Sequence, residues 1–184
     1  MASELIDACK QNDIGRVREL LDRGADPNLQ DYSGMTVLIW ASRRGNTDVV
    51  RLLLDHGADP DFESVSGRTP VMYASKRGNT DVVRLLLDRG ADPNCRFGGG
   101  QTALMLASEM GYIEVVRLLL DHGVDPNLQD TDGWTALSDA LYCGHTNVVK
   151  LLEAVCWNRN IARPLEDLDI FPEGLIREHL TISV

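Results

Sequence analysis

The sequence predicts an all-α solenoid in which short helix-turn-helix units stack side by side. The first observation is an internal period of 33 residues that recurs through four copies without an insertion. Several residue types keep this period independently: Gly34, Gly67, Gly100 and Gly133; Thr36, Thr69, Thr102 and Thr135; Ala41, Ala74, Ala107 and Ala140. The second observation is that each copy holds two short apolar runs separated by turn residues. Two short helices cannot bury their apolar faces alone, so neighbouring copies must stack into one continuous core.

Each element of a unit has its own signal in the sequence. Thr36 is predicted to cap a helix over residues 37–44, because its hydroxyl can accept a bond from a free backbone N–H. That helix should stop at Gly45, and Asn46 should cap a second helix. The second helix should end at Gly57, since glycine readily adopts the left-handed conformation that closes a helix.

The repeated pattern resembles the ankyrin repeat. The residues that carry the resemblance are Asp31-x-x-Gly34-x-Thr36-x-Leu38-x-x-Ala41-x-x-x-Gly45, then Val49-Val50-x-Leu52-Leu53-Leu54-x-x-Gly57-Ala58-Asp59-Pro60. The resemblance covers about residues 4–155. It implies an ankyrin-repeat solenoid with protruding turn fingers, built from a capping repeat (1–30) and four repeats (31–63, 64–96, 97–129 and 130–158).

The tail, residues 159–184, departs from the repeat and leaves two interpretations open. It is either a cap on the last repeat or a docking box through which the protein acts as a ubiquitin-ligase substrate adaptor. Pro164-Leu165-x-x-Leu168 resembles the start of a SOCS box, although Asp169 stands where that motif has cysteine. Residues 168–180 resemble an F-box equally faintly, and the last three residues resemble a PDZ ligand.

Composition narrows the classes of partner. The net charge of -10 and the pI of about 4.7 repel phosphate, so nucleic acid and anionic membranes are not expected partners. No apolar run has the length of a signal peptide or membrane span, so we expect the protein in the cytoplasm, with the nucleus as an alternative. We also expect it to be a monomer. The four cysteines are far apart and lack a C-x-x-C pair, which favours free thiols over disulfides or zinc.

No catalytic chemistry is expected. The chain has no nucleophile elbow, no H-E-x-x-H motif and no phosphate loop, and Gly98-Gly99-Gly100 falls on a repeat turn. The histidines His56, His122 and His145 fall at repeat positions that indicate structural roles. Arginines precede acids by four residues and predict exposed pairs within single helices: Arg51 with Asp55, Arg84 with Asp88, and Arg117 with Asp121. We therefore predict no enzyme, no cofactor and no metal.

The resemblance implies that the turn fingers and first helices form a concave face that holds a partner protein or peptide. The candidate residues around the turns are Tyr32, Met35, Arg68, Gln101 and Trp134. A helix column is assigned as Trp40, Tyr73, Leu106 and Leu141, whose two aromatic members suit an interface or, alternatively, fill the groove floor. The first helices end in further candidates: Arg43 and Arg44, Lys76 and Arg77, Met110, and Tyr142.

The four basic residues at these helix ends lead to the functional hypothesis. They should cluster in the middle of the groove, where they would attract an acidic peptide or protein surface. The alternative is that cations at helix C-termini merely offset the helix dipole. A protein-interaction module, either a scaffold or an inhibitor, is the leading interpretation. The alternatives are the ligase adaptor and an engineered or self-assembling repeat scaffold.

Overall fold

A computed structural model describes residues 2–158 of the chain, with the side chains of residues 3–155. Within that range the chain forms ten helices and no strand. The all-α prediction is confirmed, and the helices are α1 (Ala2–Gln11), α2 (Ile14–Asp22), α3 (Val37–Arg44), α4 (Thr47–Asp55), α5 (Pro70–Lys76), α6 (Thr80–Asp88), α7 (Ala103–Glu109), α8 (Ile113–Asp121), α9 (Ala136–Tyr142) and α10 (Thr146–Asn158). The predicted tail interpretations, cap or docking box, fall on residues 159–184 and lie outside the described part.

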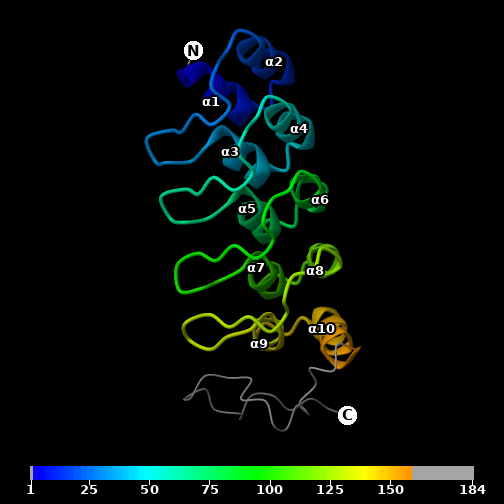
Figure 1. Cartoon of the computed structure of the whole chain (residues 1–184). Helices are drawn as coiled ribbons and strands as arrows, with labels where there is room; N and C mark the ends of the chain where they lie inside the picture. The colour runs from blue at the N-terminus through cyan, green and yellow to red at the C-terminus, as the bar shows by residue number, and fades with distance from the viewer. Residues whose placement is uncertain (1, 159–184) are drawn as a thin grey trace.

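The helices form two parallel rows (Figure 1). The odd-numbered helices pack on one another in sequence order, and each also packs against the even-numbered helix that follows it. The loops that precede α3, α5, α7 and α9 project from one side of the stack as fingers (Figure 1). Because the stack advances by one copy at a time, residues 33 positions apart lie in neighbouring layers. A side chain on one layer can therefore touch its counterpart on the next.

The core runs through the whole stack as columns of equivalent residues. One column is completely buried in every layer: Leu20, Leu53, Leu86, Leu119 and Leu152. A second column consists of alanines with no exposed surface: Ala41, Ala74, Ala107 and Ala140. The small alanine side chain lets neighbouring helices approach closely, while the leucines fill the space between the two rows. Each interior layer is thus buried only because its neighbours are present.

The predicted capping bond forms at Thr36 but not at Asn46, and of the threonines equivalent to Thr36, Thr102 and Thr135 cap their helices whereas Thr69 does not. Thr36 Oγ1 accepts the backbone N–H of Ile39 at 3.1 Å. Asn46 occupies the N-cap of α4 without a side-chain capping bond. Its amide instead donates to the backbone oxygen of Cys9 in the preceding layer, at 3.4 Å. The carbonyls at a helix C-terminus lack i+4 partners within their own helix, so this bond adds to the one that the Cys9 oxygen accepts from the Asn12 N–H.

The same position ties the other layers together. Asn79 Nδ2 donates to the backbone oxygens of Ser42, at 2.9 Å, and Arg43, at 3.2 Å. His145 Nε2 lies 2.9 Å from the backbone oxygen of Glu109. In three of the four layers a polar side chain thus bonds the C-terminal end of the previous odd-numbered helix, whereas at Tyr112 an aromatic ring packs against Gly78 instead.

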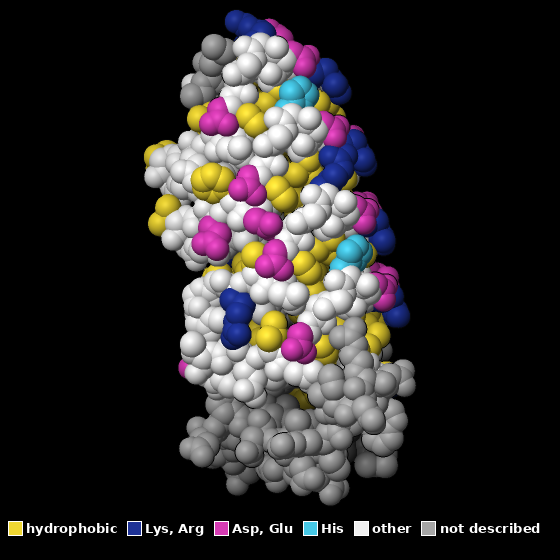
Figure 2. Space-filling view, viewed as in Figure 1, with side chains coloured by type: hydrophobic (Ala, Val, Ile, Leu, Met, Phe, Trp, Pro, Cys, Tyr) yellow, Lys and Arg dark blue, Asp and Glu magenta, His cyan; other side chains and the backbone are white. Residues whose placement is uncertain are grey.

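Around α2, Arg16 and Arg23 pair with Glu19 of the same helix, but the acids that end α4 and α6 pair with the next layer. The predicted partner of Asp55 was Arg51, but Asp55 Oδ1 lies 2.7 Å from Arg89 Nη1 of the next layer. Asp88 likewise meets His122, at 3.6 Å, instead of Arg84. Each acid ends one helix and each base follows the next, so stacking brings them closer than the turn of a single helix does. Charged side chains of both signs accordingly line the edge formed by the even-numbered helices (Figure 2).

Three further properties concern the described residues alone. None of the helices between residues 2 and 158 is both long and apolar enough to cross a membrane. No group of His, Cys, Asp and Glu side chains there could hold a metal ion. Cys9, Cys95 and Cys143 are free thiols, and burial raises the pKa of the Cys9 thiol to about 12.

Candidate functional site

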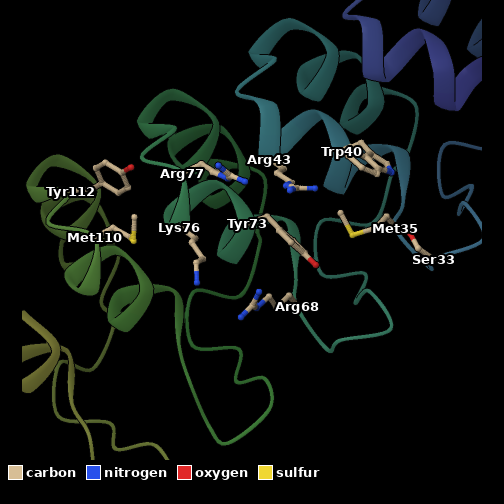
Figure 3. A pocket seen from close by; sticks show the side chains of 10 residues that line it. All are labelled: Ser33, Met35, Trp40, Arg43, Arg68, Tyr73, Lys76, Arg77, Met110 and Tyr112. Carbon is tan, nitrogen blue, oxygen red and sulfur yellow. The ribbon is translucent and has the colours of Figure 1, made fainter. Parts of the chain in front are cut away.

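A pocket of about 500 Å³ opens between the fingers and the helices α3, α5 and α7. Its walls combine aromatic rings, thioethers and cations (Figure 3). We call it the groove pocket, and its lining residues are Ser33, Met35, Trp40, Arg43, Arg68, Tyr73, Lys76, Arg77, Met110 and Tyr112. Eight of the thirteen residues predicted from the sequence line this one pocket, among them Trp40 and Tyr73 of adjacent layers.

Trp40 is held rigidly at one end of the groove pocket. Its indole Nε1 donates to Asp31 Oδ2 at 2.8 Å. Lys10 Nζ lies 4.4 Å from the centre of the indole ring and 3.6 Å from the same carboxylate oxygen. The guanidinium carbon of Arg43 lies 5.4 Å from the ring centre. The ring is thus part of the pocket wall and is fixed by polar contacts, which lowers the entropy cost of binding against it.

Asp31 is the anchor of this corner. Burial acts to raise the pKa of its carboxyl, but hydrogen bonds from Ser33, Trp40 and the backbone of Met35 outweigh burial and lower the pKa to about 2. The ionised carboxylate closes the first finger, because it accepts the N–H groups of Ser33 at 2.9 Å and Met35 at 3.1 Å. The finger and Trp40 are therefore positioned by the same group.

Arg68 and Tyr73 form the middle of the groove pocket. The guanidinium carbon of Arg68 lies 4.2 Å from the ring centre of Phe97 and 6.0 Å from that of Tyr73. Arg68 Nε is buried without a hydrogen-bond partner among the described residues. The Tyr73 hydroxyl lies 3.4 Å from both Ser64 Oγ and Ser66 Oγ of the same finger. Aromatic faces thus hold the Arg68 cation, leaving its polar edge short of acceptors.

Tyr112 closes the other end of the groove pocket, and the sequence analysis missed it. It stands at the N-cap of α8, one repeat after Asn79. Its ring covers Gly78, where a Cβ atom would lie only 2.8 Å from Tyr112 Cδ1. The signal was available, because a tyrosine replaces the polar residue that this position has in the neighbouring copies at Asn46, Asn79 and His145.

Ser33 is the second lining residue that the sequence analysis missed. It belongs to the first finger, where its hydroxyl donates to Asp31 Oδ1 at 2.6 Å. Serine in a turn is common in any loop, so nothing in the sequence distinguished it as a pocket residue.

The groove pocket is a basic site on an acidic chain. Four of its lining residues are cations: Arg43, Arg68, Lys76 and Arg77. No Asp or Glu lines the pocket, and within residues 2–158 none of the four forms an ion pair. Figure 3 shows these side chains arranged along the pocket, with Tyr73 lying between Arg43 and Arg68. Such an arrangement can form charge-assisted hydrogen bonds with carboxylates while its rings contact apolar groups.

Five predicted site residues do not line the groove pocket. Tyr32 is fully exposed on the first finger, and Arg44 is exposed beside the pocket. Gln101 pairs with Phe97 at the base of a finger. Trp134 and Tyr142 lie in the last repeat, where their rings meet edge to face with centres 5.3 Å apart.

Met35 lines the pocket from a different position than expected. The sequence placed it on an exposed finger, but only 8% of its surface is accessible. It lies between Gly34 and Thr36, the N-cap of α3, and its carbonyl closes the turn by accepting the backbone N–H of Asp31. Met35 therefore forms part of the pocket floor.

The assigned helix column needs a correction. Leu106 is only 1% exposed and belongs to the core. The residue 33 positions after Leu106 is Asp139, so Leu141 does not belong to this column. Burial, together with the charges of Glu109 and Asp130, raises the pKa of the Asp139 carboxyl to about 7. In the last repeat the position held by Trp40 and Tyr73 is therefore taken by a half-buried carboxyl with acidic neighbours.

Comparison with known proteins agrees with this architecture. The family model described as "Ankyrin repeats (3 copies)" matches residues 5–97 and 94–160, which is most of the chain. A segment of 44 residues is 46% identical to ankyrin repeat domain-containing protein 46 of Danio rerio. That segment is 24% of this chain and 19% of the relative, so the likeness concerns the repeats and not the whole relative. The chain belongs to the ankyrin-repeat family.

Proposed function

We propose that this chain is a monomeric protein-interaction module without catalytic activity, and that it binds an acidic segment of a partner protein in the groove pocket. Ankyrin repeats are generally protein–protein interaction modules, and the family is typically non-catalytic. The partner's carboxylates would meet Arg43, Lys76 and Arg77, while its apolar side chains would lie against Trp40 and Tyr73.

The observation that carries this proposal is the cluster of four cations with no acidic residue beside them. The helix dipole accounts for cations only at helix ends, such as Arg43 in the last turn of α3 and Lys76 in that of α5. Arg68 lies in a finger, away from any helix C-terminus, yet it lines the same pocket. The dipole alone therefore does not explain the cluster, and attraction of an acidic ligand does.

The test compares two variants of equal charge. The groove variant neutralises three pocket cations: Arg43→Gln, Lys76→Gln and Arg77→Gln. The control variant neutralises three exposed arginines on the even-numbered helices, none of which lines the pocket: Arg51→Gln, Arg84→Gln and Arg117→Gln. The control positions and Arg77 are exposed, whereas Arg43 and Lys76 are half-buried. None of the six belongs to the core, so both variants should fold.

Both variants and the unmodified chain are then applied to a library of random short peptides, with binding measured at low and high salt. We expect the unmodified chain and the control variant to select peptides rich in Asp and Glu with at least one large apolar residue. The groove variant should lose that selection, and salt should weaken the binding. Selection without a bias toward acidic peptides, or equal selection by all three proteins, would contradict the proposal.

A further inference from the structure

We propose that an acidic segment of this same chain, residues 165–173, binds in the groove pocket and competes with the partner for it. This inference rests on the proposed function, because it takes the pocket to be a site for acidic segments. The segment lies outside the described residues, and only its sequence and its distance along the chain enter the argument.

The composition of the segment matches the groove pocket. It reads Leu-Glu-Asp-Leu-Asp-Ile-Phe-Pro-Glu, with four acids, four large apolar residues and no base. The pocket offers four cations and no acid, together with the rings of Trp40, Tyr73 and Tyr112. Acids that alternate with apolar residues can face both kinds of group at once, since the rings and cations are interleaved along the pocket (Figure 3).

The chain is long enough to make this contact. The segment begins seven residues after Asn158, where α10 ends, and an extended chain advances about 3.3 Å per residue. Asp169 can thus reach about 35 Å from the end of α10. Packed helices lie 8–10 Å apart, so one step across from α10 to α9 and two steps back to α5 amount to about 30 Å. Asp169 can therefore reach the pocket.

Attachment to the same chain favours this occupant over a free one. A segment tethered a few residues from the end of α10 has an effective concentration on the order of millimolar, so it fills the pocket most of the time if its intrinsic Kd lies below that concentration. A partner must then displace the segment. The partner's apparent Kd equals its intrinsic Kd divided by the fraction of chains whose pocket is empty. The tail would act as an internal inhibitor whose release opens the groove pocket.

Crosslinking tests the contact directly, because the chain has only three lysines: Lys10, Lys76 and Lys150. A carbodiimide joins a lysine amine to a carboxylate only when the two touch. We expect the full chain to give crosslinks between Lys76, which lines the pocket, and Glu166, Asp167 or Asp169. A tail without a preferred site would react mainly with Lys150, which is exposed and nearest in sequence, and that result would overturn the inference.

Two controls complete this test. Lys76→Arg keeps the charge but removes the reactive amine, so it should abolish this crosslink. A mixture of ¹⁵N-labelled and unlabelled protein shows whether the crosslink joins one chain or two. Crosslinks found only between chains would mean that a second copy supplies the segment, which overturns the claim of self-inhibition.

A binding measurement then separates this inference from the proposed function. The probe is a fluorescein-labelled synthetic peptide of residues 164–174, followed by anisotropy. The tail variant replaces the four acids by amides: Glu166→Gln, Asp167→Asn, Asp169→Asn and Glu173→Gln. We expect the probe to bind this variant about tenfold more tightly than the unmodified chain, because the internal competitor is gone. Adding the three groove substitutions to the tail variant should abolish binding.

Each alternative result has a distinct meaning. Equal affinity of the probe for the unmodified chain and the tail variant overturns the internal competition but leaves the groove pocket as an acidic-peptide site. Failure of the probe to bind the tail variant also overturns the inference. The proposed function itself fails if the random library shows no preference for acidic peptides, or if the groove variant selects them as well as the unmodified chain does.

Discussion

Gly78 offers a quantitative test of how the layers hold the groove pocket together. Its φ is +71°, a conformation that costs an L-residue roughly 1–2 kcal/mol. In Gly78→Ala the new Cβ would also lie 2.8 Å from Tyr112 Cδ1, so the half-buried ring must move and lose roughly 1–2 kcal/mol of packing. The expected loss in the free energy of unfolding is therefore about 2–4 kcal/mol.

Gly90 is the matched control, because its φ is +89° and a Cβ there would have nothing within 4 Å. Gly90→Ala should cost only the conformational part, about 1–2 kcal/mol. Urea unfolding followed by far-ultraviolet circular dichroism measures both. In a Tyr112→Ala background the two substitutions should cost the same, because the contact is gone. If Gly78→Ala and Gly90→Ala lowered the free energy of unfolding equally with Tyr112 present, the reasoning would be refuted, because the ring contact would then contribute nothing to stability.

Three further outcomes are expected. Asp139→Asn should raise the melting temperature at pH 8 more than at pH 5. The pKa of this carboxyl is raised to about 7 in the folded protein, so its ionisation destabilises the fold increasingly as the pH rises from about 4 through 7. A pH series of melting curves without this trend would mean that the carboxyl titrates normally. Asn79→Ala should lower the free energy of unfolding by about 1–3 kcal/mol, because it removes two hydrogen bonds to backbone carbonyls of the preceding layer. Urea unfolding without such a loss would mean that water replaces the amide. Trp40→Phe removes the indole donor to Asp31 and should weaken acidic-peptide binding severalfold in anisotropy titrations, whereas unchanged affinity would place the ligand elsewhere.

The fold could be predicted from the sequence because the residues that end and cap the helices recur every 33 positions in several copies. Gly45, Gly78 and Gly111 each end a first helix with positive φ, and each has the next layer packed close against it. A single such glycine would be ambiguous, but a column of them at a fixed period fixes both helix length and stacking. The pocket followed, since in-register stacking brings Trp40 and Tyr73 to one surface.

The remaining details depend on contacts between layers, which a period alone does not describe. Asn46 looks like an ordinary helix cap in the sequence, but the carbonyl of the preceding layer competes for its amide. Arg44 and Arg77 hold the same repeat position, yet only Arg77 lines the pocket, so the repeat position alone does not decide which cation takes part. Tyr112 was missed because its role depends on the packing of its ring against Gly78 of the neighbouring layer.

The most direct test of the acidic-peptide site is a ¹H–¹⁵N titration of the chain with an acidic peptide selected from the library. The indole N–H of Trp40 is a reporter inside the groove pocket, whereas that of Trp134 lies outside it. We predict that the Trp40 signal moves in proportion to the bound fraction and that the Trp134 signal stays in place. A peptide that binds while leaving the Trp40 signal unmoved would contradict the account.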